Sequence, residues 1–197
     1  MPCKNNYRLL QLLIPFLLWS ANTAYSKTIK GIDIPEQIRQ PVSQQPLMLN
    51  GAGIRSKFIF SIYIGALYLP SKQTTVTAIL QHNTPRRVMM YCLYHEIDKA
   101  KLVDAWNEGF SDNSDKQTLK QLHDRLTEFN RLFPPLHKGD TVYLDYAPDK
   151  GTTLTFNGKV LGNIPGEDFN IALLKVWLGD DPADSSLKAA MLGNEDE

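Results

Sequence analysis

The sequence predicts an α+β fold, in which a mostly antiparallel sheet carries helices on one face. Three observations support this prediction. Strand-like apolar segments dominate residues 28 to 95, two helical patterns follow directly between residues 98 and 133, and short alternating strands return between residues 141 and 164. Helices that are gathered together, rather than alternating with strands, favour an antiparallel sheet over a parallel one.

The first 26 residues have the pattern of a secretory signal peptide. Lys4 and Arg8 make a positive start, residues 9 to 19 are apolar, and small residues around Ala24 and Ser26 suit cleavage. The apolar segment is too short to span a bilayer as a helix, although an uncleaved anchor is the alternative. We therefore expect export, a single domain over residues 27–193 and an acidic tail over residues 194–197.

Charge and cysteine content narrow the class of protein. The 21 basic and 21 acidic residues give a formal net charge of +0, which argues against a nucleic-acid partner. Cys3 leaves with the signal peptide, so Cys92 is alone and no internal disulfide can form. An exported chain of this kind suits a bacterial periplasm. No later apolar run is long enough to cross a membrane, and we expect Cys92 to be a buried small hydrophobe.

The N-terminal half alternates strand patterns with one short helix. Residues 28–34 alternate with period two and predict a strand. The apolar, β-branched and aromatic stretch over residues 46–70 includes a predicted long strand over residues 57–69, preceded by a turn or bulge at residues 50–53. Helical spacing of apolar residues then predicts a short helix over residues 73–81.

The next segments predict a central strand and two helices. Residues 87–95 are apolar at both odd and even positions, as in a strand that is covered on both faces. Asp98 is the predicted N-cap of a helix that reaches about Phe110. Asp115 begins a second helix, whose buried stripe continues to Phe133.

The C-terminal part predicts three strands followed by helices. The Asn157-Gly158 pair is a strong hairpin signal, and it joins two of the three strands. Gly179 is the expected end of the following helix, and Asp184 caps a last one. The strands are expected at residues 141–146, 152–156 and 159–164, and the helices at residues 165–178 and 184–191.

Familiar catalytic and metal-binding signatures are absent from the sequence. The four histidines are scattered, and neither a nucleophile elbow nor a phosphate loop is present. The acids at Asp180, Asp181 and Asp184 fit capping and solvation better than metal binding. We expect no cofactor and no metal. The remaining candidates are Arg55 and Tyr63, with Asn107 beside Tyr91 or Tyr143 as a further possibility.

Arg55 lies inside the apolar stretch, where a buried cation needs a partner. That partner is either a carboxylate of the protein, which the residues alone favour, or a ligand. A guanidinium together with the phenol of Tyr63 could hold a carboxylate or phenolate, and apolar walls would hold its hydrocarbon part. Eight residues of straight strand would separate the two side chains by roughly 26 Å. They can share a site only if the chain bends between them, near Ser56 and Lys57.

Several segments together resemble the chalcone isomerase family, and in particular its bacterial, exported branch. They are the glycine–arginine segment 51–55, the strand segment 63–69, the hairpin 157–159, the strand exit 164–166 and the helix end 177–179. The resemblance extends over nearly all of the mature chain. It implies an open-faced β-sandwich, in which a large antiparallel sheet carries helices on one face.

The resemblance also implies two possible activities. Enzymes of this family close a chalcone into a flavanone, whereas non-catalytic relatives bind fatty acids, and in both the arginine that matches Arg55 faces the ligand. At the position of Tyr63 the enzymes have threonine and the fatty-acid binders have tyrosine. Asn107 matches an asparagine of the enzymes, but their nearby tyrosine is replaced by Ala100.

Three hypotheses follow. The first is an exported binding protein for a small amphipathic anion such as a fatty acid, held by Arg55 and Tyr63. The second is an isomerase that acts on a phenolic or enone substrate by ring closure, with Arg55, Tyr63 and Asn107 as its site. The third is a structural or partner-binding envelope protein, which an apolar face left uncovered by helices would favour. The sequence leaves the oligomeric state open.

Overall fold

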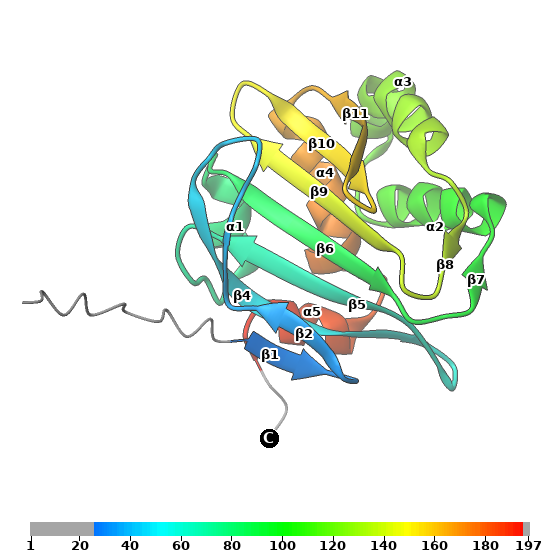
Figure 1. The fold of residues 1–197 in the computed structure, drawn as a ribbon. Helices are drawn as coiled ribbons and strands as arrows, with labels where there is room; N and C mark the ends of the chain where they lie inside the picture. Colours follow the sequence, from blue (N-terminus) through cyan, green and yellow to red (C-terminus); the bar gives the residue numbers. More distant parts are fainter. Residues whose placement is uncertain (1–25, 195–197) are drawn as a thin grey trace, which may run out of the picture.

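The structure, a computed structural model, describes residues 26–194, and this part of the chain is built around a seven-stranded sheet (Figure 1). Every strand pairs antiparallel with its neighbours, in the order β11-β10-β9-β6-β5-β4-β3, which confirms the predicted sheet. The strands are β3 (Gln37–Arg39), β4 (Pro46–Lys57), β5 (Phe60–Leu69), β6 (Arg86–Cys92), β9 (Thr141–Ala147), β10 (Gly151–Phe156) and β11 (Lys159–Ile164). The expected signal peptide and acidic tail lie outside the described residues, apart from Ser26 and Asn194.

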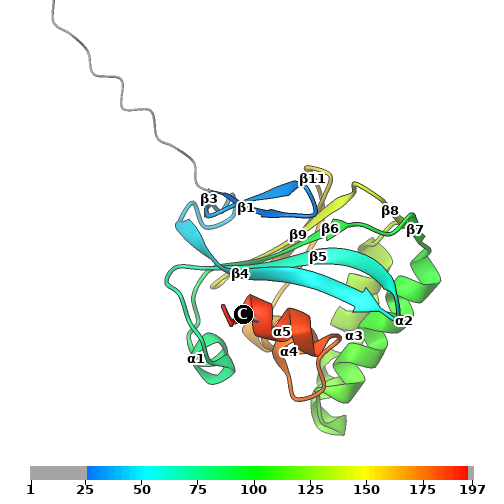
Figure 2. The ribbon, with the colours of Figure 1, turned by 90° about the horizontal axis from the view of Figure 1, so that it is seen from below.

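The helices of the described chain lie on one face of this sheet, as the sequence predicted (Figure 2). They are α1 (Val76–Gln81), α2 (Lys99–Asp112), α3 (Lys116–Leu132), α4 (Glu167–Leu178) and α5 (Ser185–Met191). The core between helices and sheet is aromatic at its centre, where Trp106 of α2 contacts Phe129 of α3 and Trp177 of α4 at ring distances of 5.3 and 5.4 Å. A two-stranded ladder of β7 (Glu96–Ile97) and β8 (Leu136–His137) lies at the ends of α2 and α3.

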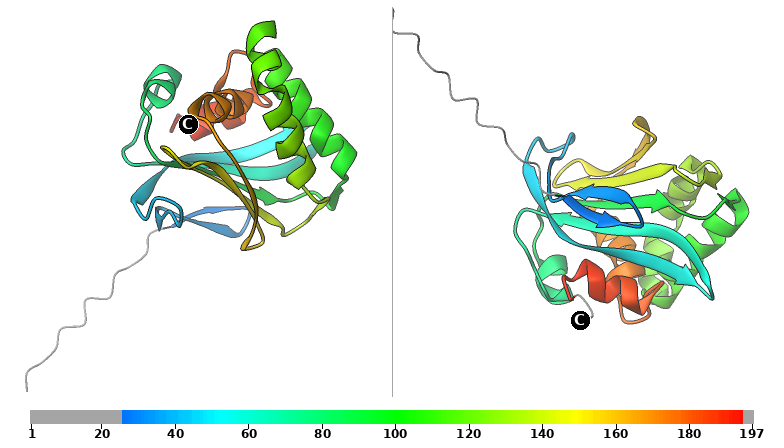
Figure 3. Two further views of the ribbon diagram at one scale, coloured as in Figure 1. Left: turned by 90° about the horizontal axis from the view of Figure 1, so that it is seen from above. Right: turned by 60° about the horizontal axis from the view of Figure 1, so that its bottom comes forward.

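A second, smaller layer covers the opposite face of the sheet (Figure 3). It is a hairpin of β1 (Ser26–Ile29) and β2 (Ile32–Pro35), whose Ile34 is buried against Ile64 and its neighbours in the sheet. The prediction of one strand over residues 28–34 is therefore wrong. Lys30 and Gly31 have positive φ angles of 49° and 75°, and they form a two-residue turn in the middle of the predicted strand.

Local capping signals of the sequence are confirmed. The side chains of Asp98, Asp115 and Asp184 each accept a hydrogen bond from the backbone N–H three residues further on, at the start of α2, α3 and α5. The Asn157-Gly158 turn, with φ angles of 46° and 80°, joins β10 to β11. These features depend only on neighbouring residues, so tertiary contacts were not needed to predict them.

The apolar stretch over residues 46–70 forms a hairpin and not one long strand. β4 and β5 are joined by a two-residue turn at Phe58 and Ile59, so the predicted continuous strand over residues 57–69 is wrong at its start. The alternative of a bulge at residues 50–53 is confirmed, because Asn50 is the extra residue in the register of β4 against β5. Its buried side chain amide donates to the carbonyl oxygen atoms of Gln73 and Met191, at 2.9 and 2.7 Å.

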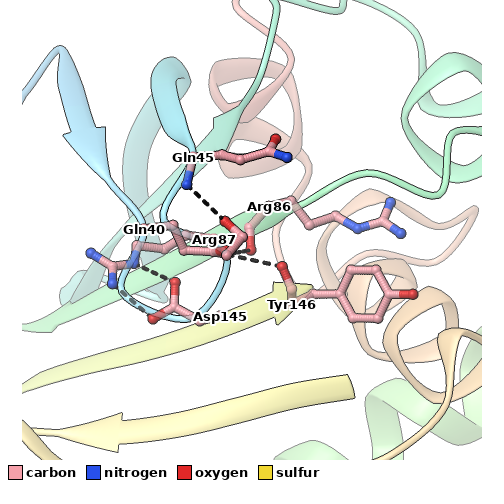
Figure 4. Close-up of polar contacts among 7 residues, drawn as sticks. Gln40, Gln45, Arg86, Arg87, Asp145 and Tyr146 are labelled. Carbon is pink, nitrogen blue, oxygen red and sulfur yellow. Dashed lines mark hydrogen bonds and ion pairs between the residues drawn. The ribbon is translucent and has the colours of Figure 1, made fainter. Parts of the chain in front are cut away.

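Two consecutive arginines of β6 are buried on opposite sides of the sheet (Figure 4). The Arg87 guanidinium donates two hydrogen bonds of 2.7 Å to the carboxylate of Asp145 on β9. Arg86 points the other way, donates to the carbonyl oxygen of Ile79 at 2.8 Å and lies 4.8 Å from the ring centroid of Tyr146. Burial lowers the pKa of Arg86, and the phenol of Tyr146 partly opposes this effect.

Candidate functional site

The β4–β5 hairpin brings Arg55 and Tyr63 together. The bend that a shared site requires is present at Phe58 and Ile59, and it makes Arg55 the direct cross-strand partner of Tyr63. The guanidinium carbon of Arg55 lies 5.7 Å from the centroid of the Tyr63 ring. Cross-strand partners project from the same face of the sheet, so both side chains lie on the helix-covered side.

A cavity of ≈ 470 Å³ opens beside this pair, between the β4–β5 hairpin, the end of β6 and helix α2. Arg55 and Tyr63 both line it. Much of the wall is apolar, and it includes Phe58, Phe60, Ile62, Met90, Ile97 and Leu102. The volume lies within the range of about 300–1,000 Å³ that is typical of small-molecule sites. The arrangement can therefore enclose an organic ligand with one polar end.

The guanidinium of Arg55 has no carboxylate partner among residues 26–194. Its Nε atom is buried and lacks a hydrogen-bond acceptor within the described chain. The rest of the group lies between the main cavity and a second one of ≈ 360 Å³, which Glu108 and Asp181 also line. Within residues 26–194 the internal ion pair that the residues alone favoured is thus not formed, and Arg55, with its planar set of donors, lines both cavities.

Tyr63 is held as a neutral phenol. Its side chain is 5% exposed, and its hydroxyl oxygen accepts a 2.8 Å hydrogen bond from the indole N–H of Trp177. Burial raises the pKa of Tyr63, while the positive charge of Arg55 and the bond from Trp177 oppose that rise. The phenol consequently keeps its proton at neutral pH, and this O–H is a donor rather than a base.

Replacing Tyr63 by phenylalanine is expected to lower the free energy of unfolding by about 1–3 kcal/mol, because the buried indole N–H of Trp177 loses its acceptor. Urea denaturation of the two proteins measures the difference. Tyr94 offers the matched control, since it lines the same cavity but its hydroxyl makes no hydrogen bond within residues 26–194. A loss no greater than that of Tyr94→Phe would contradict the structural role of the Tyr63 hydroxyl.

The third predicted site residue does not join this pair. Asn107 lies on the exposed side of α2, where its side chain oxygen accepts a 2.8 Å hydrogen bond from Asn130 of α3, and it does not line the cavity. Tyr91 and Tyr143 pack on the opposite face of the sheet, with the β1–β2 layer. The ring closure hypothesis used Asn107 as a third group, and Asn107 does not line the cavity that Arg55 and Tyr63 share.

The wall that α2 contributes was not predicted. Lys101, Asp104, Ala105 and Glu108 line the cavity, and their spacing of three or four residues places them on one side of the helix. That side could have been found from the sequence as the polar edge of an amphipathic helix. With Arg55, Lys57 and Glu96, the lining carries three cations and three anions, so its formal charge is balanced.

The part of the chain that the structure describes contains one cysteine, Cys92, and no cluster of metal-ligating side chains. Among residues 26–194, no three His, Cys, Asp or Glu side chains are placed to hold a metal ion. Cys92 is buried, as predicted, and burial raises the pKa of its thiol. Over the same residues no helix has the length and apolar character that a membrane span requires.

The fold and the cavity define a protein with an antiparallel sheet, helices on one face and a ligand-sized space between them. Residues 26–193 match the sequence model of the chalcone isomerase-like family, and the chain belongs to that family. No curated protein sequence matches the chain. Among solved structures, an Arabidopsis thaliana fatty-acid binding protein resembles it with a TM-score of 0.57 and 14% sequence identity, over 81% of this chain and 97% of that one. At this identity the likeness establishes a common fold.

Proposed function

We propose that this protein binds a small amphipathic anion of the fatty-acid type. The carboxylate would lie against the guanidinium of Arg55, with the phenol of Tyr63 close by, and the hydrocarbon part would lie along the apolar wall. The observation that carries the proposal is a partly buried guanidinium that has no carboxylate partner among residues 26–194 and lies at a cavity of ≈ 470 Å³ with a largely apolar wall. The structural likeness to a fatty-acid binding protein of Arabidopsis agrees with this chemistry.

The local geometry around Arg55, and not the overall electrostatic field of the cavity, would select the anion. The cavity lining is formally neutral, so long-range attraction of an anion is weak. Arg55 differs from Lys57 and Lys101 because its Nε atom is buried and lacks an acceptor within residues 26–194, and because a guanidinium can donate two parallel hydrogen bonds to one carboxylate. We further propose that binding takes place outside the cytoplasm, after export directed by residues 1–26.

The third hypothesis, a partner-binding envelope protein, finds less support. An apolar sheet face left uncovered by helices would favour it, but the β1–β2 hairpin packs on the face opposite the helices. Among the described residues, the large apolar side chains that remain exposed are Phe58, Ile59, Phe60 and Val160, and three of these lie at one hairpin tip. This distribution is a local feature and not an open face.

Arg55→Met is the direct test. Hydrogen bonds to a charged group contribute about 1.5–3 kcal/mol, so the variant should bind a long-chain fatty acid roughly 10- to 150-fold more weakly than the wild type. Calorimetric titration of delipidated protein measures both affinities. The matched control is Arg131→Met, because Arg131 is exposed on α3 and its ion pair is with Glu128 on the surface.

A fatty alcohol of the same chain length separates head-group recognition from burial of the tail. The wild type should prefer the acid, and Arg55→Met should bind acid and alcohol equally. Equal affinities of the wild type for acid and alcohol, or an unchanged affinity of Arg55→Met for the acid, would show that the guanidinium does not hold the ligand.

A further inference from the structure

The tip of the β4–β5 hairpin exposes large apolar side chains. Phe58 is 91% exposed, Ile59 is 90% exposed and the neighbouring Phe60 is 49% exposed. The two-residue turn has a positive φ of 55° at Phe58 alone, and in such turns glycine is the preferred first residue. An aromatic residue here combines backbone strain with full exposure, and neither favours folding. Such a combination points to a role for the tip outside the folded core.

The same tip lies at the cavity. Phe58 and Phe60 line it together with Lys57, which is also exposed, whereas Ile59 does not line it. Figure 1 shows the hairpin extending past the other strands of the sheet on the side of α2. A molecule that entered or left the cavity here would pass the apolar tip.

A lipid bilayer suits this tip better than a protein partner. Stable protein interfaces bury roughly 800 Å² on each partner, and a contiguous patch of three side chains at a two-residue turn is far smaller. Insertion of a few apolar side chains below the lipid head groups needs no such area, and the adjacent Lys57 suits the phosphate level of the membrane surface.

We propose that the Phe58–Ile59 tip inserts into the surface of a lipid bilayer and brings the cavity next to it. This inference rests on the proposed function, because an amphipathic anion of the fatty-acid type is itself concentrated in bilayers. The ligand would move between bilayer and cavity along Phe58 and Phe60 without crossing water as a free monomer.

Flotation with vesicles of phosphatidylcholine and phosphatidylglycerol tests the insertion. The wild type should float with the vesicles, and Phe58→Gly/Ile59→Ser should lose at least about tenfold in partition coefficient, given the apolar area removed. This pair of substitutions supplies the residues that the turn prefers, so the fold is retained. The single variant Ile59→Ser should lose part of the binding. Val160→Ser is the matched control, since Val160 is 61% exposed elsewhere, on β11.

The outcomes separate this inference from the proposed function. Ile59 does not line the cavity, so Ile59→Ser should keep its affinity for the fatty acid in solution but take it up more slowly from loaded vesicles. Arg55→Met should still float. A wild type that does not float, or variants that float as it does, would overturn the inference. So would a self-association in sedimentation that Ile59→Ser abolishes, because the tip would then bind a second copy of the chain.

Discussion

Replacing Arg87 by methionine is expected to lower the free energy of unfolding by about 3–5 kcal/mol. The carboxylate of Asp145 is 1% exposed and has the Arg87 guanidinium as its partner, with two hydrogen bonds of 2.7 Å. Without that cation the carboxylate is buried and uncompensated, which is among the most unfavourable situations in a protein core. Urea denaturation at neutral pH measures the loss.

Two further variants test whether the loss of stability arises because the Arg87–Asp145 pair is buried. Arg125 and Asp168 form a pair of the same bidentate geometry, but their side chains are 27% and 59% exposed, so Arg125→Met should lower stability by about 1 kcal/mol at most. The double variant Arg87→Met/Asp145→Leu should recover much of the loss, since it leaves no unpaired charge. An equal effect of Arg87→Met and Arg125→Met would contradict the prediction.

The sequence could not reveal this buried pair. Arg87 and Asp145 are 58 positions apart, and they meet because β6 and β9 are adjacent with these two residues in register. Both strands were predicted from local apolar patterns, but strand order and register depend on the whole sheet. For the same reason the β1–β2 layer was missed, since its position over Ile64 is set by contacts across the fold.

The Asn157-Gly158 turn was predicted, whereas the turns at Lys30-Gly31 and Phe58-Ile59 were missed. Asn157-Gly158 joins two strands as its residues indicate, because both tolerate positive φ. Phe58 and Ile59 carry no turn signal, so the pattern at the centre of the chain predicts one strand where the structure has a hairpin. Phe58, which misled the prediction, has a strained backbone with positive φ. Such strain is expected where a role other than folding determines which residue occupies the position.

The candidate site was partly predictable. Arg55 was singled out as a cation among apolar residues, and the requirement that it meet Tyr63 predicted a bend between them, which the β4–β5 turn provides. The contribution of α2 to the cavity and the bond from Trp177 to Tyr63 were not predicted. Both depend on how the helices dock on the sheet, and periodicity alone does not specify that docking.

Gly51→Ala is expected to lower the free energy of unfolding by about 3 kcal/mol, the upper part of the range for overpacked cores. Helix α5 lies directly on β4, and a Cβ atom at Gly51 would clash with the carbonyl oxygen of Ala190. This contact is with backbone, so no side-chain rotation can relieve it, and α5 must move. Gly51 and Gly53 therefore serve close packing of a helix on a strand.

Gly53→Ala and Gly65→Ala provide the matched comparison in urea denaturation. A Cβ atom at Gly53 would meet the Cβ of Ala190 at 2.6 Å, so Ala190→Gly should restore part of the stability of Gly53→Ala, but not of Gly51→Ala. At Gly65 the nearest atoms are the ends of the Leu187 side chain, at 3.1 and 3.2 Å, and the loss should be smallest. Equal losses at the three positions would contradict the prediction.

Gly51→Ala also tests how α5 supports the candidate site. Asp184 caps α5 through one carboxylate oxygen and accepts a 2.9 Å hydrogen bond from the backbone N–H of Ser56 through the other. The start of the helix is thereby fixed to β4 next to Arg55. If Gly51→Ala displaces α5, it should also weaken fatty-acid binding, although Gly51 does not line the cavity. Unchanged affinity in a destabilised Gly51→Ala protein would show that the hairpin alone positions the guanidinium.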